Sequence, residues 1–260
     1  MSDRDVTEQL RTLGLRCPHD ALRSLLEHGT KTRASPVEIC EQLVALERRT
    51  RDSLNLARST KGATLGSFTP LDQFAWAHPH SIDRPLYERL LTLDFVDKAE
   101  NVLFRGPSGV GKTTLAQNLG HAALLRGYSV RFTTLAAALS DLLRQESLPA
   151  LDRRLRRYTS PSIWICDELG YLPCDGRSAD ILYNILSRRH ESRSTVITTN
   201  LAFKLWNTVF PGAACVGALV DRFAQHCHVV DIEAESWRQN PSRPPPPRIA
   251  AAKSRKPKRR

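Results

Sequence analysis

Several features that would place the chain in a special class of protein are absent. The six cysteines form no CxxC pair and no Cys/His cluster at zinc-site spacing, so the sequence gives no support for a zinc site. No apolar run approaches the roughly 18 residues of a membrane span, and residues 1–10 lack the basic-then-apolar pattern of a secretory signal. We therefore expect a cytoplasmic protein with no membrane partner.

Acidic residues are missing from one end of the chain. Residues 239–260 contain eight Lys or Arg residues and no acid, which leaves only about +3 of the net charge of +11 to the preceding residues. The segment is also rich in proline and cannot bury enough apolar surface to fold, so we expect a disordered basic tail. Its charge favours a polyanionic partner but does not distinguish nucleic acid from an acidic surface.

The remaining chain divides into three segments with different patterns. Residues 1–60 show apolar residues at helical spacing, which predicts a small helical N-terminal region. Glycines and prolines interrupt residues 61–82, which we interpret as a linker. Residues 83–238 alternate short apolar runs with amphipathic helices, which indicates an α/β domain with a five-stranded parallel sheet and helices on both faces. The expected strands are 101–104, 129–133, 163–166, 195–198 and 228–232.

A phosphate-binding pattern follows the first expected strand. Residues 106–113 read GPSGVGKT, which fits GxxxxGK[ST], and they precede a predicted helix, as the motif requires. Glycines let the backbone N–H groups turn toward phosphate oxygens, and the helix adds its positive N-terminal end. We expect Lys112 to reach the β- and γ-phosphates and the Thr113 hydroxyl to ligate Mg²⁺. The expected cofactors are thus ATP and Mg²⁺, and the expected contacts are Gly106, Pro107, Ser108, Gly109, Val110, Gly111, Lys112, Thr113 and Thr114.

Polar residues end two further strands at the edge where open α/β sheets bind ligands. Asp167 and Glu168 end the run SIWICDE. We expect Asp167 to hold Mg²⁺, usually through water, and Glu168 to polarise the water that attacks the γ-phosphate. Asn200 ends the run STVITT and could orient that water, although Asn is also a common strand terminator.

Arg222 and the arginines at 151–158 lie outside this edge, and each of these two groups allows two interpretations. Arg222 could complete a neighbouring subunit's site by stabilising charge on the transferred phosphoryl group, or it could form a structural ion pair. The run LDRRLRRY at 151–158 presents four arginines on an expected helix. Some of these could track DNA phosphates, or the helix could be a solvated face that pairs with Asp152 and nearby acids.

These motifs together resemble the IstB family of transposition helper ATPases, which are close relatives of the DnaC-type helicase loaders within the AAA+ class. The resemblance covers roughly residues 10–238 and is densest in LTLDFVDKAENVLFRGPSGVGKT, ICDELGYLP and LSRRHESRSTVITTN. It implies an AAA+ fold in which residues 106–113 are the Walker A loop and Asp167 and Glu168 the Walker B pair. Asn200 would be the sensor and Arg222 the arginine finger.

The resemblance also implies partners: ATP-dependent assembly on DNA, homo-oligomers with ATP sites at subunit interfaces, and delivery to or activation of a transposase that contacts the N-terminal helices. Two departures stand out. VFPGAACVGAL replaces the family's usual acid- and proline-containing stretch before the arginine-finger helix, and no helical lid supports Arg238 as a second sensor.

Three functions remain as alternatives. The first is a transposition helper that hydrolyses ATP, the second is a replicative helicase loader, and the third is an ATP-gated DNA-binding scaffold with negligible hydrolysis. A small G-protein is disfavoured because no [NT]KxD segment follows the fourth strand. A metabolite kinase is disfavoured because no arginine-bearing lid is evident.

Overall fold

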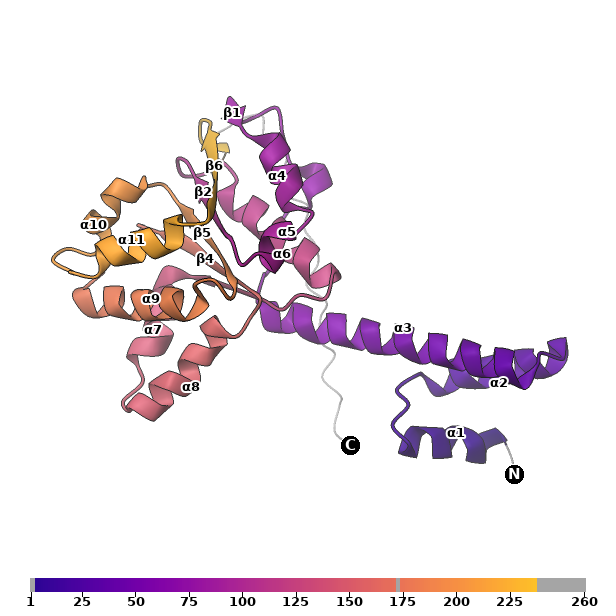
Figure 1. Cartoon of the computed structure of the whole chain (residues 1–260). Coiled ribbons are helices and arrows are strands. Elements are labelled where there is room, and N and C mark those ends of the chain that lie inside the picture. The colour runs from indigo at the N-terminus through magenta and orange to yellow at the C-terminus, as the bar shows by residue number, and fades with distance from the viewer. Residues whose placement is uncertain (1–2, 172–173, 238–260) are drawn as a thin grey trace, which may run out of the picture.

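The protein has two parts, an N-terminal arm of helices and an α/β core (Figure 1). The structure, a computed structural model, describes residues 3–171 and 174–237. The expected disordered tail at 239–260 and the doubtful second sensor Arg238 lie outside these residues. None of the described helices is both long and apolar enough to cross a membrane.

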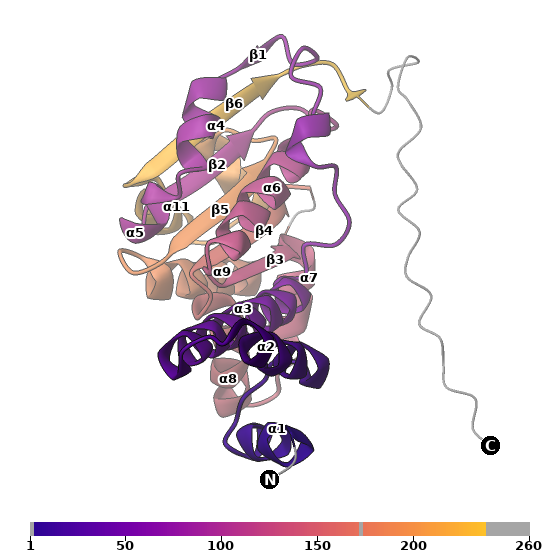
Figure 2. The ribbon, with the colours of Figure 1, turned by 90° about the vertical axis from the view of Figure 1, so that its right-hand side faces the viewer.

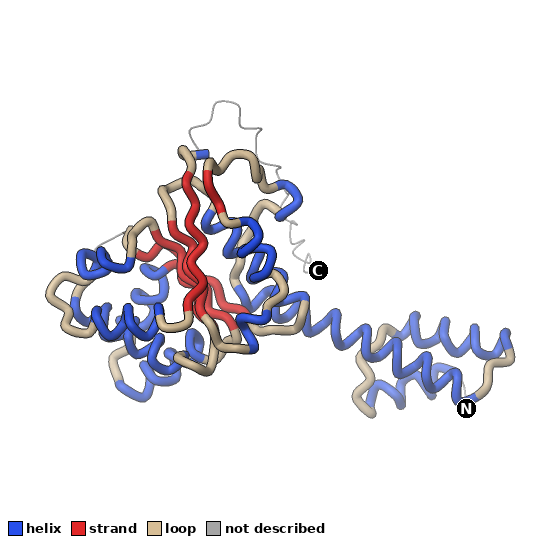
Figure 3. Tube along the Cα trace, turned by 45° about the horizontal axis from the view of Figure 1, so that its top comes forward, coloured by secondary structure: helices blue, strands red, loops and turns tan. Residues whose placement is uncertain are grey.

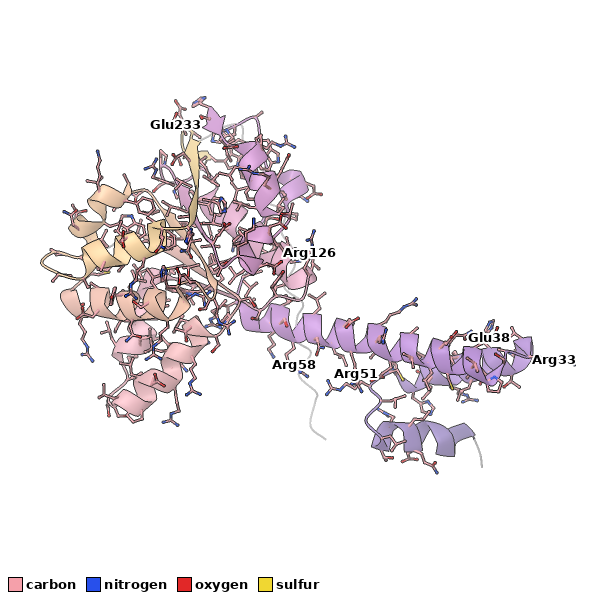
Figure 4. All side chains as sticks on the ribbon, viewed as in Figure 1. Arg33, Glu38, Arg51, Arg58, Arg126 and Glu233 are labelled. Atoms are coloured by element: carbon pink, nitrogen blue, oxygen red, sulfur yellow. The ribbon has the colours of Figure 1, made fainter. Side chains whose placement is uncertain are left out.

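Three helices build the arm: α1 (Asp3–Thr12), α2 (His19–Thr32) and α3 (Pro36–Ala63). A capping box starts α3, because the Ser35 hydroxyl accepts from the Glu38 N–H and the Glu38 carboxylate accepts from the Ser35 N–H. Helices α2 and α3 approach closely at Gly29, where an added Cβ would lie 3.0 Å from the Ile39 side chain. This end of the arm, marked by Arg33 and Glu38, points away from the core (Figure 4).

The other end of α3 is joined to the core. Ala63 is fully buried and Leu65 nearly so. The Gln117 amide donates to the Leu65 carbonyl oxygen at 2.6 Å, and the Thr64 hydroxyl donates to the Phe132 carbonyl oxygen at 2.6 Å. These contacts, of which the Gln117 bond is buried, fix the chain at the point where it leaves the arm.

The core contains one sheet with strand order β1-β6-β2-β5-β4-β3. Its strands are β1 (Ser81–Ile82), β2 (Asn101–Arg105), β3 (Val130–Thr134), β4 (Ile163–Leu169), β5 (Ser194–Thr199) and β6 (Cys227–Glu233). The five longer strands are parallel, as predicted from the alternating pattern.

The expected count of five strands is wrong by one. Strand β1 pairs antiparallel with β6, with Ser81 opposite Glu233 and Ile82 opposite Ile232. Two residues are too few to show the period of two by which a strand is recognised in a sequence. The segment that we interpreted as a linker therefore contributes a short edge strand.

Helices cover both faces of the sheet, as Figure 3 shows with the strands in red between blue helices. They are α4 (Arg84–Leu90), α5 (Asp94–Asp97), α6 (Lys112–Leu125), α7 (Leu135–Leu143), α8 (Leu148–Thr159), α9 (Gly176–Arg189), α10 (Trp206–Val209) and α11 (Val216–Ala224), with the 3-10 turns η1 (Leu71–Gln73) and η2 (Phe203–Leu205). Side chains alternate along β2, so Leu103 joins the core under α7 and α9, whereas Val102 and Phe104 join the core under α4 and α6.

Close packing of α6 on the sheet sets the position of the phosphate-binding loop. Helix α6 lies over the sheet (Figure 2), and its Gly120 is buried. A Cβ at Gly120 would lie only 2.7 Å from the Ile165 side chain of β4, so a larger residue would displace either that side chain or the helix. The N-terminus of α6 is thereby held at the carboxyl edge of the parallel strands.

Candidate functional site

The loop between β2 and α6 has the backbone that phosphate binding needs. Gly109 and Gly111 have φ angles of +82° and +97°, a region that residues with a Cβ rarely adopt. A Cβ at Gly109 would lie 2.3 Å from the Ser236 hydroxyl, and one at Gly111 would lie 2.7 Å from the Phe74 ring. Both positions favour glycine, because the φ angles are positive and an added Cβ would clash with a neighbouring side chain. This agrees with the expectation that glycines let the loop turn its N–H groups toward phosphate.

Lys112 lies across this loop. Its ammonium donates to the carbonyl oxygens of Gly106 at 2.8 Å and Pro107 at 2.6 Å. Helix α6 begins at Lys112 with no side-chain cap, so its first N–H groups and the lysine share one concave surface. A phosphate there would replace the carbonyl oxygens as partners of the ammonium.

Asp167 and Thr113 meet at the start of α6. Asp167 is only 3% exposed, and the Thr113 hydroxyl lies 3.0 and 3.1 Å from its two carboxylate oxygens. A hydroxyl next to a carboxylate is an oxygen donor set that suits Mg²⁺. The two residues expected to bind the metal are thus neighbours, which their separation of 54 residues in the sequence did not guarantee.

Glu168 is placed differently from Asp167. A bulge interrupts the pairing of β4 with β5 between Cys166 and Leu169, and Glu168 has a φ of +63°. This left-handed conformation is uncommon outside glycine and turns the side chain into solvent, where it is exposed. One acid of the pair is therefore buried beside Thr113, and the other faces an open cleft.

That cleft gathers most of the expected catalytic groups. Asn200 follows β5 and lines the cleft together with Glu168 and Lys112. The full lining is Ser108, Gly109, Lys112, Thr113, Glu168, Leu169, Tyr171, Thr198, Thr199 and Asn200. An amide, a carboxylate and an ammonium that converge on one space can hold a water molecule against a phosphate.

A second cavity of about 300 Å³ adjoins the same loop. Its walls come from the loop, from the segment before β1 and from the residues after β6, and include Phe74, His78 and Trp237. The His78 ring lies 4.6 Å from the Trp237 ring, and its Nε2 is 2.9 Å from the Glu235 carbonyl oxygen. The Trp237 N–H donates to the Gly109 carbonyl oxygen at 3.1 Å, which fixes this wall to the loop.

These wall residues were not predicted from the sequence. They lie in the segment interpreted as a linker and at the end of the core, more than 150 residues apart, so no local pattern joins them. The available signal was composition: Phe68, Phe74 and Trp76 crowd a segment that has no helical or strand period. Aromatic side chains in such a segment indicate that it packs on a neighbouring domain.

Arg222 does not reach the loop of its own chain. It lies on α11, with its guanidinium carbon 5.0 Å from the centre of the Tyr183 ring of α9, and it lines neither cavity. No ion pair of Arg222 occurs within the described part of the chain, so that alternative gains no support. Its role in a neighbouring subunit stays a prediction.

The four arginines of α8 divide into two pairs. Arg154 makes two hydrogen bonds to Asp141, which hold the pKa of that carboxyl below its ordinary value, and Arg156 lies 3.8 Å from Asp152. Arg153 and Arg157 form no ion pair with any acid among the residues that the structure describes. Pairing with acids therefore accounts for only half of the basic helix.

Comparisons with known proteins agree with this geometry. The family profile described as IstB-like ATP binding protein matches residues 8–244. A protein named as the ATP-binding protein of insertion sequence IS232 of Bacillus thuringiensis subsp. berliner is 32% identical over 237 residues, which cover 91% of this chain and 95% of that protein. The protein named for insertion sequence IS21 of Pseudomonas aeruginosa is 32% identical over 217 residues, 84% of this chain and 82% of that one.

A solved structure with a similar fold is AMPPCP-bound DnaA from Aquifex aeolicus. It matches with a TM-score of 0.55 at 20% identity, over 65% of this chain and 51% of that chain. At this identity the likeness shows the fold alone, which is the P-loop fold of the AAA+ class that the sequence predicted.

Proposed function

The chain belongs to the family of IstB-like ATP-binding proteins, and we propose that it hydrolyses ATP as a helper of DNA transposition, assembling on DNA and delivering or activating a partner transposase. The observation that carries the proposal is the cleft in which Lys112, Glu168 and Asn200 converge beside the Thr113–Asp167 pair. These are the groups that phosphate binding, metal binding and water activation require.

ATP fits the site in three parts. The Gly109–Gly111 backbone and Lys112 would hold the phosphates, and the cavity walled by Phe74, His78 and Trp237 would take the base. Thr113 and Asp167 would hold Mg²⁺, which when bound neutralises charge between the β- and γ-phosphates. Glu168 would accept a proton from the attacking water, and Asn200 would orient it.

The charge distribution favours a polyanionic partner, and the names of the relatives, which place them in insertion sequences, favour DNA. The net charge is +11, and Arg153 and Arg157 are basic groups of α8 without acid partners among the described residues. A DNA backbone supplies phosphates that such groups bind. The basic residues at 243–260 would add contacts to DNA.

The position of Arg222 supports assembly into homo-oligomers. Since it lies away from the phosphate loop of its own chain, it would act only on the ATP of a neighbouring subunit. We place the activity in the cytoplasm, where transposon DNA and ATP are both present. The distal end of the arm would contact the transposase, because it is exposed and makes no contribution to the ATP site.

Relatives at 32% identity over most of the chain favour transposition over a DnaC-like helicase loader. Both of them carry names that place them in insertion sequences. The likeness to replication proteins concerns the fold only.

The deciding experiment measures ATP affinity and steady-state turnover with and without duplex DNA. We expect Lys112→Ala to lose tight ATP binding, and Glu168→Gln to bind ATP normally while turnover falls by about a hundredfold or more. Wild-type ATP binding without turnover, also in the presence of DNA, would instead identify an ATP-gated scaffold. A pull-down with the transposase encoded beside this chain's gene tests the partner, with a helicase as the competing bait.

A further inference from the structure

Thr198 lies opposite the β-bulge that contains both acidic residues. It lies on β5 opposite the bulge of β4: Cys166 pairs with Ile197 and Leu169 pairs with Thr199, so Asp167 and Glu168 together face Thr198. The residue is 1% exposed. Its side chain is therefore shielded from water and lies next to both acidic residues.

Its hydroxyl contacts both acids at once. It donates to the Asp167 carboxylate at 2.5 Å and accepts from the Glu168 N–H at 3.0 Å. A hydroxyl has one hydrogen to give, and Thr198 gives it to Asp167 while a lone pair receives the Glu168 N–H. No other side chain in the described residues is bonded to both members of the pair.

The contact to Glu168 compensates for the bulge. At the bulge the Glu168 N–H leaves the ladder between β4 and β5, and the residue adopts a φ of +63° that costs free energy. A hydrogen bond from a rigid neighbouring strand keeps that conformation in place. The side chain of Glu168 consequently points into the cleft rather than along the sheet.

We propose that Thr198 is a positioning residue that sets the place of both carboxylates, so that the metal-binding acid and the water-activating acid are aligned by one hydroxyl. The inference rests on the proposed ATP hydrolysis and deepens it. Strand β5 also carries the Thr199 carbonyl, which accepts from the Gly106 N–H at 3.2 Å, and it ends before Asn200. The two acids and the phosphate loop are thus hydrogen-bonded to β5, and Asn200 directly follows this strand.

The test compares Thr198→Val, which keeps the shape and loses the hydroxyl, with Thr198→Ser, which keeps the hydroxyl. The matched control is Thr133→Val on β3, where the lost hydroxyl accepts from the Trp164 indole at 2.9 Å and touches neither acid. For each full-length variant we would measure ATP affinity, turnover and the Mg²⁺ concentration that gives half-maximal turnover. Circular dichroism reports whether the variants fold, and Thr198→Ala replaces Thr198→Val if the latter does not.

We expect Thr198→Val to reduce turnover by at least about tenfold and to raise the Mg²⁺ requirement, since small displacements of catalytic groups are costly. ATP affinity should stay within about threefold, Thr198→Ser should restore most of the turnover, and Thr133→Val should behave as wild type. In a Glu168→Gln background, Thr198→Val should reduce turnover by a smaller factor than in the wild type, because one of the two acids that it positions is already disabled.

Two results would overturn the proposal. One is wild-type turnover and Mg²⁺ dependence in a folded Thr198→Val protein, and the other is an equal loss in Thr133→Val, which would indicate a general effect on the sheet. If the wild-type protein itself does not hydrolyse ATP, the proposed function fails first. The two failures are therefore distinguishable.

Discussion

In the α/β core, some polar side chains are buried and bound to several partners at once, whereas in the arm nearly all polar side chains lie in solvent. Arg189 of the core is 1% exposed and donates to four carbonyl oxygens and one hydroxyl, on residues 158, 161, 162, 194 and 195. Arg23 of the arm makes one ion pair, to Glu27, and both side chains remain about half exposed.

This difference in the burial of polar side chains indicates different roles for the core and the arm. A buried polar group with every partner in place keeps its geometry, and catalysis depends on such fixed geometry. An exposed helix gains little from its surface ion pairs and is stable mainly where it packs. Helix α3 packs at its ends, against α2 and against the core, so the arm is suited to be reoriented by a partner rather than to hold a reacting group.

The largest effect is expected in the core. Replacing Arg189 by Met should lower the free energy of unfolding by at least about 3 kcal/mol, because its buried acceptors lose their donors. Replacing Arg23 by Met should change it by less than about 1 kcal/mol. Thermal unfolding of the two full-length variants measures the difference, and equal shifts would remove the contrast between the two regions.

An intermediate effect is expected at the joint between the regions. Gln117→Leu leaves the Leu65 carbonyl oxygen without its donor and should cost about 1–3 kcal/mol locally. Hydrogen exchange around residues 63–69 should then accelerate, and ATP affinity should weaken, because the segment that follows forms a wall of the cavity. Gln145→Leu is the control, since that amide donates to the Asp141 carbonyl oxygen on α7 and not to a residue of the joint. Unchanged exchange in Gln117→Leu would show that the arm is not held through this contact.

The smallest effect is expected within the arm. The Glu47 carboxylate accepts from the backbone N–H groups of Arg16 and Cys17 and from Arg51. Burial opposes this charge, but the bonds from Arg51, Arg16 and Cys17 outweigh it and lower the pKa of Glu47.

A lowered pKa means that the stabilisation is complete above the ordinary glutamate pKa and is lost as the pH falls through the folded-state value. The link between α3 and the loop that joins α1 to α2 should therefore loosen only below about pH 4.3. Glu47→Gln should loosen it at neutral pH, with faster hydrogen exchange at residues 13–17 and ATP affinity unchanged. A change in ATP affinity would contradict the independence of the arm from the site.

Much of the site could be predicted from the sequence because its signals are local. GPSGVGKT lies within eight residues, and the acids and Asn200 each end an apolar run, so a strand followed by a polar residue indicated the edge of the sheet. The five parallel strands and the family followed from the same local patterns. The short strand β1 did not, because two residues carry no period.

The sequence by itself determined the phosphate loop, the parallel strands and the residues that carry charge at their ends, since these depend on neighbours along the chain. Tertiary structure decided which of the two acids is buried, because the bulge opposite Thr198 turns Glu168 outward and leaves Asp167 beside Thr113. It also placed Phe74 and His78 beside Trp237. It paired Arg154 with Asp141, whereas Arg157 forms no ion pair among the described residues. The physical reason is that these relations depend on strand register and on packing between segments far apart in the chain, which no local pattern encodes.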